Sequence, residues 1–465
     1  MVKTLPKRKM YRYCLADIAK GLFNGMIGNY LLYFFQPTVK SGLPQLLPQD
    51  KLLGYITIMA LITALGKIVD AVTDPLVASL SDKCTHKAGR RIPFLRGAAV
   101  PYALSVLLIF YAPFRSGSVA NAVWVAVFLV TYYTAYTFFF IPRNALVPEI
   151  IPDAKVRVGY YGISTAFFMG SSSFMYAATL FVNLLKNAGF SPLWAWRTVF
   201  TLFAAIGVTC LLLSAYAFEE KDYVTANVKP KESLLHSCGQ VFKNKNFLCF
   251  AAGDLFSGVS MAFFQTAMLY YITMLLNVPE SQSFLVMLSA IGVALCLFPL
   301  IIKISRKYNK KAPLIAASVV FTIVFAFIFF GDKIAALAPG HELLVGLALG
   351  VVVSFPFAAI NILPQSIISD IIQQDSLQSG VNREGIFSAT KTFIEKCASA
   401  LAMMVVSSVL AIGAGPDEAV GMLGVKLTGV FAGAFSLLSL LFFLFYNDKK
   451  VTDYIEAHTG KGQNK

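Results

Sequence analysis

The sequence predicts an all-α membrane protein, in which twelve transmembrane helices form two pseudo-symmetric bundles of six. Of the 465 residues, 57% are hydrophobic and only 14% are charged, and a water-soluble domain of that composition could not solvate its surface. The apolar residues gather in twelve long stretches, and the longest polar interruption, residues 219–245, divides these stretches into two sets of six.

Each apolar stretch has about 20 residues or more, which is enough for a helix to cross the hydrocarbon core of a bilayer. In chain order, the expected spans are residues 11–36, 51–81, 94–114, 120–148, 157–186, 193–218, 246–276, 281–303, 311–331, 342–372, 385–412 and 422–446. We therefore expect an amino-terminal bundle over 1–218, a linker over 219–245, a carboxy-terminal bundle over 246–448 and a tail over 449–465.

Basic residues are concentrated in alternate loops. The strongest clusters are Lys3, Lys7, Arg8, Lys9 and Arg12 before the first span, Lys83, Lys87, Arg90 and Arg91 after the second, and Lys303, Arg306, Lys307, Lys310 and Lys311 after the eighth. By the positive-inside rule, these loops, the linker and both termini are cytoplasmic. The formal charge of +15 is therefore a topology signal with a weak attraction to anionic lipid, and we expect no nucleic-acid partner. No cleavable signal peptide is expected, and the protein is predicted to be a multi-pass protein of the plasma or inner membrane.

The two halves resemble each other locally. The first span contains AKGLFNG at residues 19–25, and the seventh contains AGDLFSG at residues 252–258. The fourth and tenth spans both carry prolines in their later parts. Such matches are expected of parallel repeats about an axis normal to the membrane, and they favour two bundles that flank a central cavity.

The residue types that carry enzymatic chemistry are not arranged for it. The seven cysteines are odd in number and fall in spans or loops, so they predict no disulfide framework. The four histidines lie in loops or tails, without the spacing of a metal site or a catalytic triad. We expect no enzyme activity and no cofactor.

A pair of acids lies within the second apolar span. Asp70 and Asp74 are four residues apart, so both carboxylates point the same way on a helix. Charged groups are costly inside a bilayer unless they face a partner or a wet cavity. With the hydroxyl of Thr73, the two carboxylates offer the oxygen ligands that a small hard cation prefers. The alternative is a pair of helix-packing acids neutralised by Lys67 and other bases.

Four ordered segments resemble the glycoside–pentoside–hexuronide:cation symporters, which include the melibiose carriers and belong to the major facilitator superfamily. They are AKGLFNGMIGNYLLYFF (19–35), DAVTDPLVASLSDKCTHKAGRRIPFLRG (70–97), YTFFFIPRNALVPEIIPDAKVR (136–157) and SGVNREGIFSATKTFIEKCASALA (379–402). The Asp-x-x-x-Asp-Pro segment with its Gly-Arg-Arg loop is the most specific of them. The resemblance implies the major facilitator fold.

The resemblance also implies a cation site. In the melibiose carriers, the coupling cation is held by two second-span aspartates, a polar residue between them and a fourth-span threonine. These roles fall on Asp70, Asp74, Thr73 and Thr137. Thr73 supplies one hydroxyl where the family usually has an amide. Sodium is the first expectation for the coupling ion and a proton the second.

The substrate positions implied by the resemblance are only partly retained. They correspond to Lys20, Phe140, Asn144, Thr165, Asn361, Thr392 and Lys396. The two lysines and Thr392 are kept, whereas the other four positions have lost an aspartate, two tryptophans and an arginine. A second sugar-binding aspartate is replaced by Gly21. Because both acids that grip sugar hydroxyls are absent, neutral galactosides are poor candidates for the substrate.

The loss of these acids is accompanied by two basic residues in the same spans or in the eleventh span. Arg143 follows Pro142 in the fourth span, and Lys391 precedes Lys396 in the eleventh. We therefore expect an anionic substrate, namely a hexuronide, a sulfonated or phosphorylated sugar, or a lysophospholipid-like amphiphile. The alternative for each base is an ion pair within the protein. The acids available for such pairs are Asp17, Glu149, Asp254, Asp370 and Glu395.

Three charged residues follow the second span. Asp82, Arg90 and Arg91 resemble the cytoplasmic motif of the superfamily, in which charges latch the two halves in the outward-facing state. The alternative is a solvated charge cluster that only fixes topology.

Together, these patterns predict a monomeric, cation-coupled secondary symporter that carries a sugar-like, anionic solute by alternating access. Its partners would be the small-molecule substrate and membrane lipid. One alternative is a sodium-dependent carrier of lysophospholipid-like amphiphiles, and the other is a non-transporting receptor on the same fold. The retention of Asp70 and Asp74 argues against a receptor, which has no need of costly charges in the membrane.

Overall fold

The computed structural model describes residues 5–49, 51–52, 56–151, 154–223, 244–307, 309–337, 339–379, 384–415 and 418–459. The chain divides into two compact units. Unit 1 comprises Met1–Val228, Glu280–Phe284 and Met403–Gly421, and unit 2 comprises Lys229–Pro279, Leu285–Ala402 and Met422–Lys465. Most of the predicted linker over 219–245 lies outside the described residues.

Unit 1 consists almost entirely of helices. They are α1 (Lys7–Cys14), α2 (Ala16–Gly25), α3 (Leu31–Phe35), α4 (Ile58–Lys83), α5 (Ile92–Phe110), α6 (Val119–Ile150), α7 (Ala154–Phe174), α8 (Ala178–Asn187) and α9 (Pro192–Ala215). A π-helical turn, η1 (Met26–Tyr30), joins α2 to α3. Short 3-10 turns form η2 (Val39–Ser41), η3 (Met175–Ala177), η4 (Glu220–Asp222) and η6 (Glu280–Gln282).

The second span begins later than the sequence predicts. It was expected from residue 51, but Lys51–Leu52 (β1) and Ile56–Thr57 (β2) pair as short antiparallel strands, with Lys51 opposite Thr57. The helix α4 then begins at Ile58, where the hydroxyl of Thr57 accepts a hydrogen bond of 3.1 Å from the backbone N–H of Ala60. This side-chain cap satisfies a backbone donor that has no partner within the first helical turn.

Unit 2 has the same helical character. Its helices are α11 (Lys245–Tyr270), α12 (Ser283–Lys307), α13 (Lys311–Phe329), α14 (Gly331–Ala336), α15 (Glu342–Ser379), α16 (Glu384–Leu410), α17 (Met422–Phe445) and α18 (Asp448–Thr459), with the π-helical turn η5 (Tyr271–Leu275) after α11. The first residues of α12 and the last residues of α16 belong to unit 1.

Ten helical segments in the described part of the chain are long and apolar enough to cross a membrane. They correspond to the expected third to twelfth spans. The expected first span is the continuous run of α2, η1 and α3, and the second is α4, which carries Lys67, Asp70 and Asp74. The charged residues of α4 lower the hydropathy of the second span.

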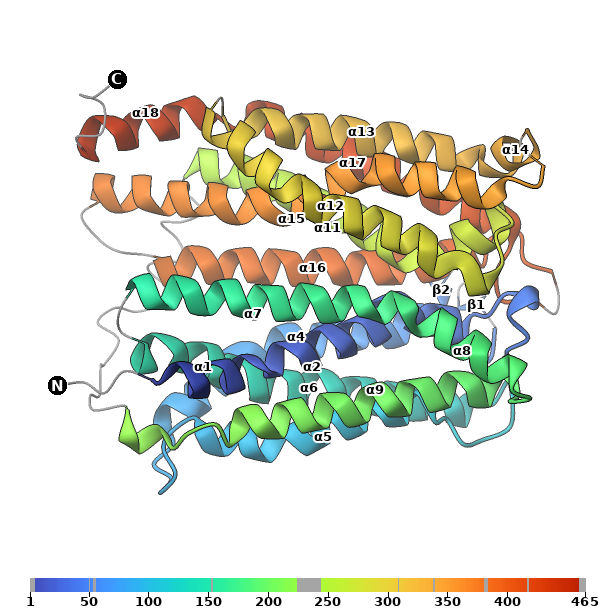
Figure 1. The fold of residues 1–465 in the computed structure, drawn as a ribbon, viewed down its shortest axis with the longest axis horizontal. Coiled ribbons are helices and arrows are strands. Elements are labelled where there is room, and N and C mark those ends of the chain that lie inside the picture. The colour runs from blue at the N-terminus through green and yellow to red at the C-terminus, as the bar shows by residue number, and fades with distance from the viewer. Residues whose placement is uncertain are drawn as a thin grey trace. The chain divides into compact units, whose positions relative to one another are not determined.

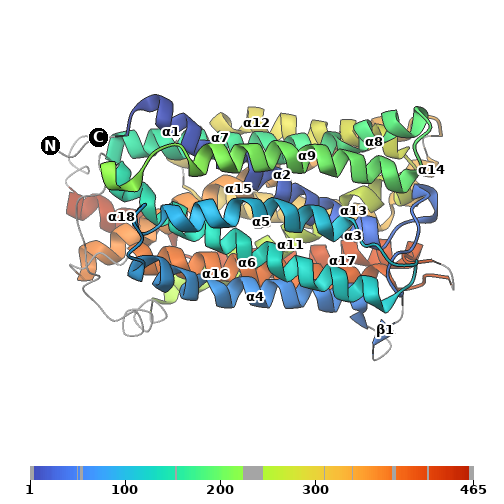
Figure 2. The ribbon, with the colours of Figure 1, turned by 90° about the horizontal axis from the view of Figure 1, so that it is seen from below.

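Glycines allow close helix packing in unit 1. The helix α2 packs against α7 and α9, and α6 packs against α4 and α5 (Figures 1 and 2). A Cβ atom on Gly21 would lie 2.1 Å from the hydroxyl of Ser171 and 2.5 Å from the carbonyl of Phe168, and one on Gly25 would lie 2.5 Å from Met175. Gly21 therefore allows the close approach of α2 to α7, and Gly25 allows its approach to the following turn η3.

Candidate functional site

The four residues assigned to the cation site lie together on α4 and α6. The hydroxyl of Thr137 donates to Oδ1 of Asp74 at 3.1 Å and lies 3.4 Å from Oδ1 of Asp70. Thr73 lies between the two acids, and its hydroxyl is 3.3 Å from that of Thr137. Asp70 and Thr137 are buried, whereas Asp74 is half-buried. The arrangement gathers two carboxylates and two hydroxyl oxygens, which are the ligand types that hard cations prefer.

The hydroxyl of Thr73 has a second contact within its own helix. It donates to the backbone carbonyl of Val69 at 2.8 Å. Ser and Thr side chains commonly bond in this way to the carbonyl four residues earlier in a helix. The bond leaves the lone pairs of the oxygen pointing away from its hydrogen, so Thr73 retains the capacity to act as a ligand.

A glycine and a tyrosine that the sequence analysis did not single out allow α4 to approach α6 closely. A Cβ atom on Gly66 would lie 2.9 Å from the ring of Tyr133. The ammonium group of Lys67 lies 4.6 Å from the centre of the same ring, a distance at which a cation and an aromatic face attract each other. The acid pair is thus flanked by Lys67, whose ammonium group lies over the ring of Tyr133 on α6.

Lys20 occupies an aromatic environment in the same unit. Its ammonium group lies 5.5 Å from the ring centre of Phe140 on α6 and 5.2 Å from that of Phe168 on α7. Among the residues that the structure describes, it has no ion pair. The space beside it, where the related carriers have an acid, is closed by the contact between Gly21 and α7. Lys20 is therefore a cation in the membrane-spanning region that forms no ion pair with any described residue.

A group of tyrosines connects the surroundings of Lys20 with those of the acid pair. The ring of Phe140 lies 4.9 Å from that of Tyr136, which lies 5.9 Å from that of Tyr102. Tyr102 in turn contacts Tyr132 at 5.2 Å, and the hydroxyl of Tyr132 donates to Asn24 at 3.2 Å. The run of aromatic residues in the fourth span was the sequence signal for this cluster, but its role was not recognised.

Arg143 matches the ion-pair alternative rather than a substrate contact. Its guanidinium donates to both carboxylate oxygens of Asp17, at 2.7 and 3.1 Å, and to the backbone carbonyl of Tyr13 at 3.0 Å. Asp17 also accepts a bond of 2.5 Å from Ser164. The side chain of Arg143 is only 2% exposed. Because its charge is already neutralised, we leave Arg143 out of the proposed substrate set.

The other predicted substrate residues are distributed over both units. In unit 1, Asn144 on α6 and Thr165 on α7 are exposed. In unit 2, Asn361 is exposed and donates to the carbonyl of Phe357 in its own helix at 2.7 Å. On α16, Thr392 is exposed and Lys396 is half-buried.

Lys391 is engaged within unit 2. Its ammonium group donates to Glu395 one turn later, and it lies 3.9 Å from the carboxylate of Asp254 on α11. Its side chain is 12% exposed, and that of Asp254 is 8% exposed. Both acids had been considered as partners of the base, and the structure brings both of them to it.

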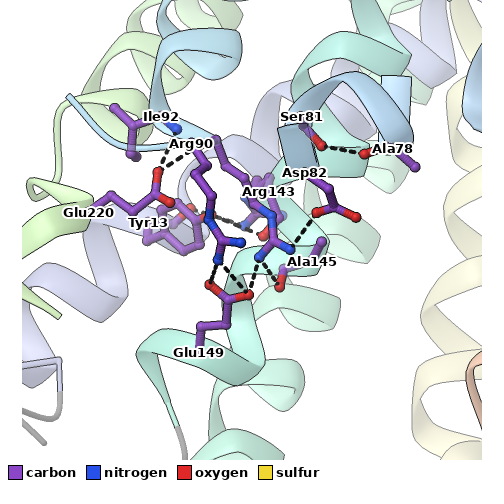
Figure 3. A network of polar contacts seen from close by, with 11 residues as sticks. Tyr13, Ala78, Ser81, Asp82, Arg90, Ile92, Arg143, Ala145, Glu149 and Glu220 are labelled. Atoms are coloured by element: carbon purple, nitrogen blue, oxygen red, sulfur yellow. Dashed lines mark hydrogen bonds and ion pairs between the residues drawn. The ribbon is translucent and has the colours of Figure 1, made fainter. Parts of the chain in front are cut away.

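The three residues predicted to form a gate are joined by an acid from α6 (Figure 3). Arg91 pairs with Asp82 at 2.9 Å and with Glu149 at 2.7 Å, and Arg90 pairs with Glu149 at 3.2 Å. These contacts all lie within unit 1. Pairing between the two halves, which a latch requires, stays a prediction.

Glu220 is a further member of this network that the sequence analysis missed. One of its carboxylate oxygens accepts bonds from the backbone N–H groups of Arg91, at 2.8 Å, and Ile92, at 3.0 Å (Figure 3). These donors begin α5, where a negative charge is favourable. Gly89 allows the contact because it has φ +114° and a Cβ atom there would lie 2.4 Å from the carboxylate. Glu220 lies in the predicted linker, yet it is buried in unit 1.

Comparison with known proteins identifies the family. The family described as MFS/sugar transport protein matches residues 12–448. The chain belongs to this family. The family resemblance and the fold class predicted from the sequence are thereby confirmed. MFS/sugar transport proteins are multi-pass membrane transporters, so the prediction that the chain is not an enzyme is confirmed as well.

Individual relatives of this MFS/sugar transport protein have low sequence identity to it, but they align with most of its length. A putative glycoside/cation symporter, YagG of Escherichia coli, is 23% identical over 76% of this chain and 74% of its own length. The lactose permease of Lactobacillus helveticus is 22% identical over 87% of this chain, which spans 62% of that permease. A putative sulfoquinovose importer of E. coli is 24% identical over 85% of this chain and 79% of its own length.

The fold is also that of solved transporters. The crystal structure of a D-xylose–proton symporter matches with a TM-score of 0.63 and 15% identity, over 96% of this chain and 98% of that one. At this identity the match concerns the fold alone, and the major facilitator fold predicted from the sequence is confirmed by it.

Proposed function

We propose that the protein is a cation-coupled secondary symporter that carries a sugar-like, anionic solute by alternating access. The observation that carries the proposal is the convergence of Asp70, Asp74 and Thr137 at one point between α4 and α6. A structural role alone gives no reason for two carboxylates at this position, since intramembrane charge is costly. Relatives named as a glycoside/cation symporter and a putative sulfoquinovose importer support the reaction class.

The coupling ion binds at the acid pair in this proposal, with sodium first and a proton second. In the structure, Thr137 donates its hydroxyl hydrogen toward the acids. On arrival of a cation, the hydroxyl can rotate and present a lone pair instead. The ion would then connect α4 to α6 through oxygen ligands and remove the repulsion between the carboxylates.

Binding of the ion can reach the solute through a short path on α6. Thr137 and Phe140 are three residues apart, so they lie on the same face of the helix one turn from each other. The ring of Phe140 carries the ammonium group of Lys20. A small shift of α6 on cation binding would therefore move the surface against which Lys20 rests. Cation and solute must raise each other's affinity by the same factor.

The solute is proposed to be anionic because Lys20 has aromatic contacts but no acid partner in the described part of the chain. An ammonium group in low-dielectric surroundings attracts an anion more strongly than one in water does. A sulfonate, carboxylate or phosphate on a sugar supplies that charge, while the tyrosine and phenylalanine rings suit the apolar face of a sugar ring. Sulfoquinovose is a sulfonated sugar and is a suitable first probe.

We further propose an oligomeric state, a membrane location and an orientation for the protein. The protein would be monomeric in a plasma or inner membrane, with both termini on the cytoplasmic side, because the basic loops lie on that side. Membrane lipid would be its remaining partner. The charged network of Asp82, Arg90 and Arg91 would stabilise one of the two states between which the carrier alternates.

Uptake by purified protein in liposomes tests the proposal. Sulfoquinovose, lactose and lysophosphatidylcholine are offered under an inward sodium gradient, an inward proton gradient, or neither. We expect sulfoquinovose to accumulate under one of the two gradients, and accumulation to be lost in Asp70→Asn and in Asp74→Asn. The control is Asp332→Asn, which removes the same type of charge from a partly exposed pair with Lys426 in unit 2. Accumulation by both acid-pair variants would contradict the proposed cation site.

The substrate preference has its own test. Lys20→Ala should weaken sulfoquinovose binding by about 2 kcal/mol, as expected for the loss of a charged hydrogen bond, with little effect on a neutral sugar. Transport of lactose as efficient as that of sulfoquinovose, unchanged in Lys20→Ala, would contradict an anionic solute. Accumulation of lysophosphatidylcholine alone would favour the amphiphile carrier instead.

A further inference from the structure

Unit 2 contains a carboxylate that the proposed symport mechanism does not use. Asp254 on α11 is 8% exposed and lies in the span Lys245–Leu275. Its carboxylate accepts no hydrogen bond from any residue that the structure describes. A buried polar group without hydrogen bonds is strongly unfavourable, more so when it is ionised. Such a group is protonated, hydrated or bound to a ligand, and the 8% exposure of the side chain leaves it accessible to a solute.

The nearest cation does not complete it. The ammonium group of Lys391 lies 3.9 Å from the carboxylate of Asp254, beyond hydrogen-bond distance. Lys391 instead donates its bond to Glu395 in its own helix, and the side chain of Glu395 is 54% exposed. An ammonium group has three donors, so Lys391 can serve Glu395 and a ligand at the same time. Asp254 and Lys391 thus present an acceptor and a donor side by side.

In the internal repeat, Asp254 of the second half corresponds to Gly21 of the first half. When AKGLFNG is aligned with AGDLFSG, Lys20 corresponds to Gly253 and Gly21 corresponds to Asp254. In unit 1, the lysine is present and the contact with α7 leaves no room for a side chain at Gly21. In unit 2, the arrangement is reversed. A Cβ atom on Gly253 would lie 2.5 Å from the ring of Phe443, and the side chain is on the next residue.

We propose that Asp254 is a substrate-binding residue, whose carboxylate accepts a hydrogen bond from a hydroxyl group of the solute, with Lys391 donating to an oxygen of the same solute. The ligand class is a polyhydroxylated, sugar-like molecule, so this inference rests on the proposed function. Carboxylate and ammonium groups placed together recognise neighbouring hydroxyl and ether oxygens, because one accepts and the other donates.

The experiment is equilibrium exchange of labelled sulfoquinovose in liposomes that contain the full-length protein, without any ion gradient. We expect Asp254→Asn to raise the KM for exchange about tenfold, as for the loss of a hydrogen bond to a charged group. The thermal stabilisation by sodium or by protons, which reports on the acid pair of unit 1, should persist. Asp332→Asn, a matched carboxylate-to-amide change elsewhere in unit 2, should leave the KM of the wild-type protein unchanged.

A second measurement needs no variant. Sulfoquinovose analogues that each lack one hydroxyl group are exchanged by the wild-type protein, and we expect at least one analogue to have a KM about tenfold above that of the parent sugar. If Asp254→Asn does not fold, Asp254→Asn/Lys391→Gln, which removes both charges, takes its place.

The outcomes separate this inference from the proposed function. A KM for exchange that is unchanged in Asp254→Asn, with gradient-driven accumulation lost, would show a proton-coupling residue and overturn the inference. Analogues that all exchange as well as the parent sugar would also overturn it, while leaving the symport proposal intact. If the wild-type protein exchanges neither sulfoquinovose nor lactose, the proposed function fails and this inference fails with it.

Discussion

The loop between α4 and α5 in unit 1 and the loop between α12 and α13 in unit 2 follow one plan with different chemistry. In unit 1, Glu220 accepts bonds from the backbone at the start of α5. In unit 2, Asp448 accepts a bond of 3.0 Å from the backbone N–H of Lys310, which precedes α13. In both units, the acid lies in the segment that follows the sixth span of that half. This segment therefore bonds to the start of the third span.

The basic residues differ. In unit 1, the guanidinium of Arg91 bridges Asp82 and Glu149 and is 8% exposed. In unit 2, the ammonium group of Lys310 pairs with Asp370 at 2.5 Å and is 24% exposed. A planar guanidinium can bind two acids at once, whereas an ammonium group acts as a point charge. The basic residue of the loop is therefore more deeply buried in the amino-terminal half, where one guanidinium joins two acids.

The largest expected difference follows from removing these two bases. Arg91→Ala should lower the free energy of unfolding by about 2 kcal/mol, because it removes a buried guanidinium that bonds to Asp82 and Glu149, while Arg90 still pairs with Glu149. Lys310→Ala should lower it by about 1 kcal/mol, since its pair is more exposed. Unfolding of both variants in the same detergent, followed by tryptophan fluorescence, gives the two values. Equal losses would mean that the richer network of unit 1 adds no stability.

The two capping acids should be nearly equivalent. Glu220→Ala and Asp448→Ala each remove a carboxylate that accepts hydrogen bonds from the backbone at the start of a helix, and each should lower the free energy of unfolding by about 1–2 kcal/mol. The same unfolding assay measures both. Loss in one variant only would show that the resemblance between the loops is superficial.

The smallest effect is expected for the partly exposed pair of Asp332 and Lys426 in unit 2. The hydrogen bond from Lys426 holds the pKa of Asp332, which is outside the spans, below its ordinary value of 3.8. A lowered pKa contributes stability above the ordinary value, and this contribution is lost as the pH falls through the lowered pKa. The stability difference between the wild-type protein and Asp332→Asn should therefore be small, constant above about pH 5, and absent in strong acid. A difference that grows on acidification would contradict this sign.

Much of the fold could be predicted from the sequence because hydropathy and charge act locally. The spans and the Asp70–Asp74 pair follow from apolar length and helical spacing. The start of α4 at Ile58 could not be predicted, since it depends on pairing between the short strands Lys51–Leu52 and Ile56–Thr57. Thr137 was assigned only through the family resemblance, because nothing local links it to an acid 67 residues away.

The remaining site residues depend on tertiary contacts. Glu220 binds the backbone of Arg91 across 129 residues, and no pattern near either residue indicates the contact. The pairing of Arg143 with Asp17 was one of two alternatives that fit the sequence equally well, and only packing of α6 against the first helices decides between them. Asp254 was visible in the sequence as an acid in a span, but not as one that accepts no hydrogen bond from the described residues.

The most direct test of the central claim is the cation dependence of solute binding. Sulfoquinovose binding to the wild-type protein and to Asp74→Asn is measured by calorimetry, in sodium or in choline at fixed pH, and then in choline across a pH series. For the wild-type protein, we predict an affinity that rises with sodium or with protons, and by linkage a cation affinity that rises with the sugar by the same factor. For Asp74→Asn, we predict an affinity that is the same under all of these conditions. A variant that binds the sugar with the cation dependence of the wild-type protein would contradict the assignment of the acid pair as the coupling site.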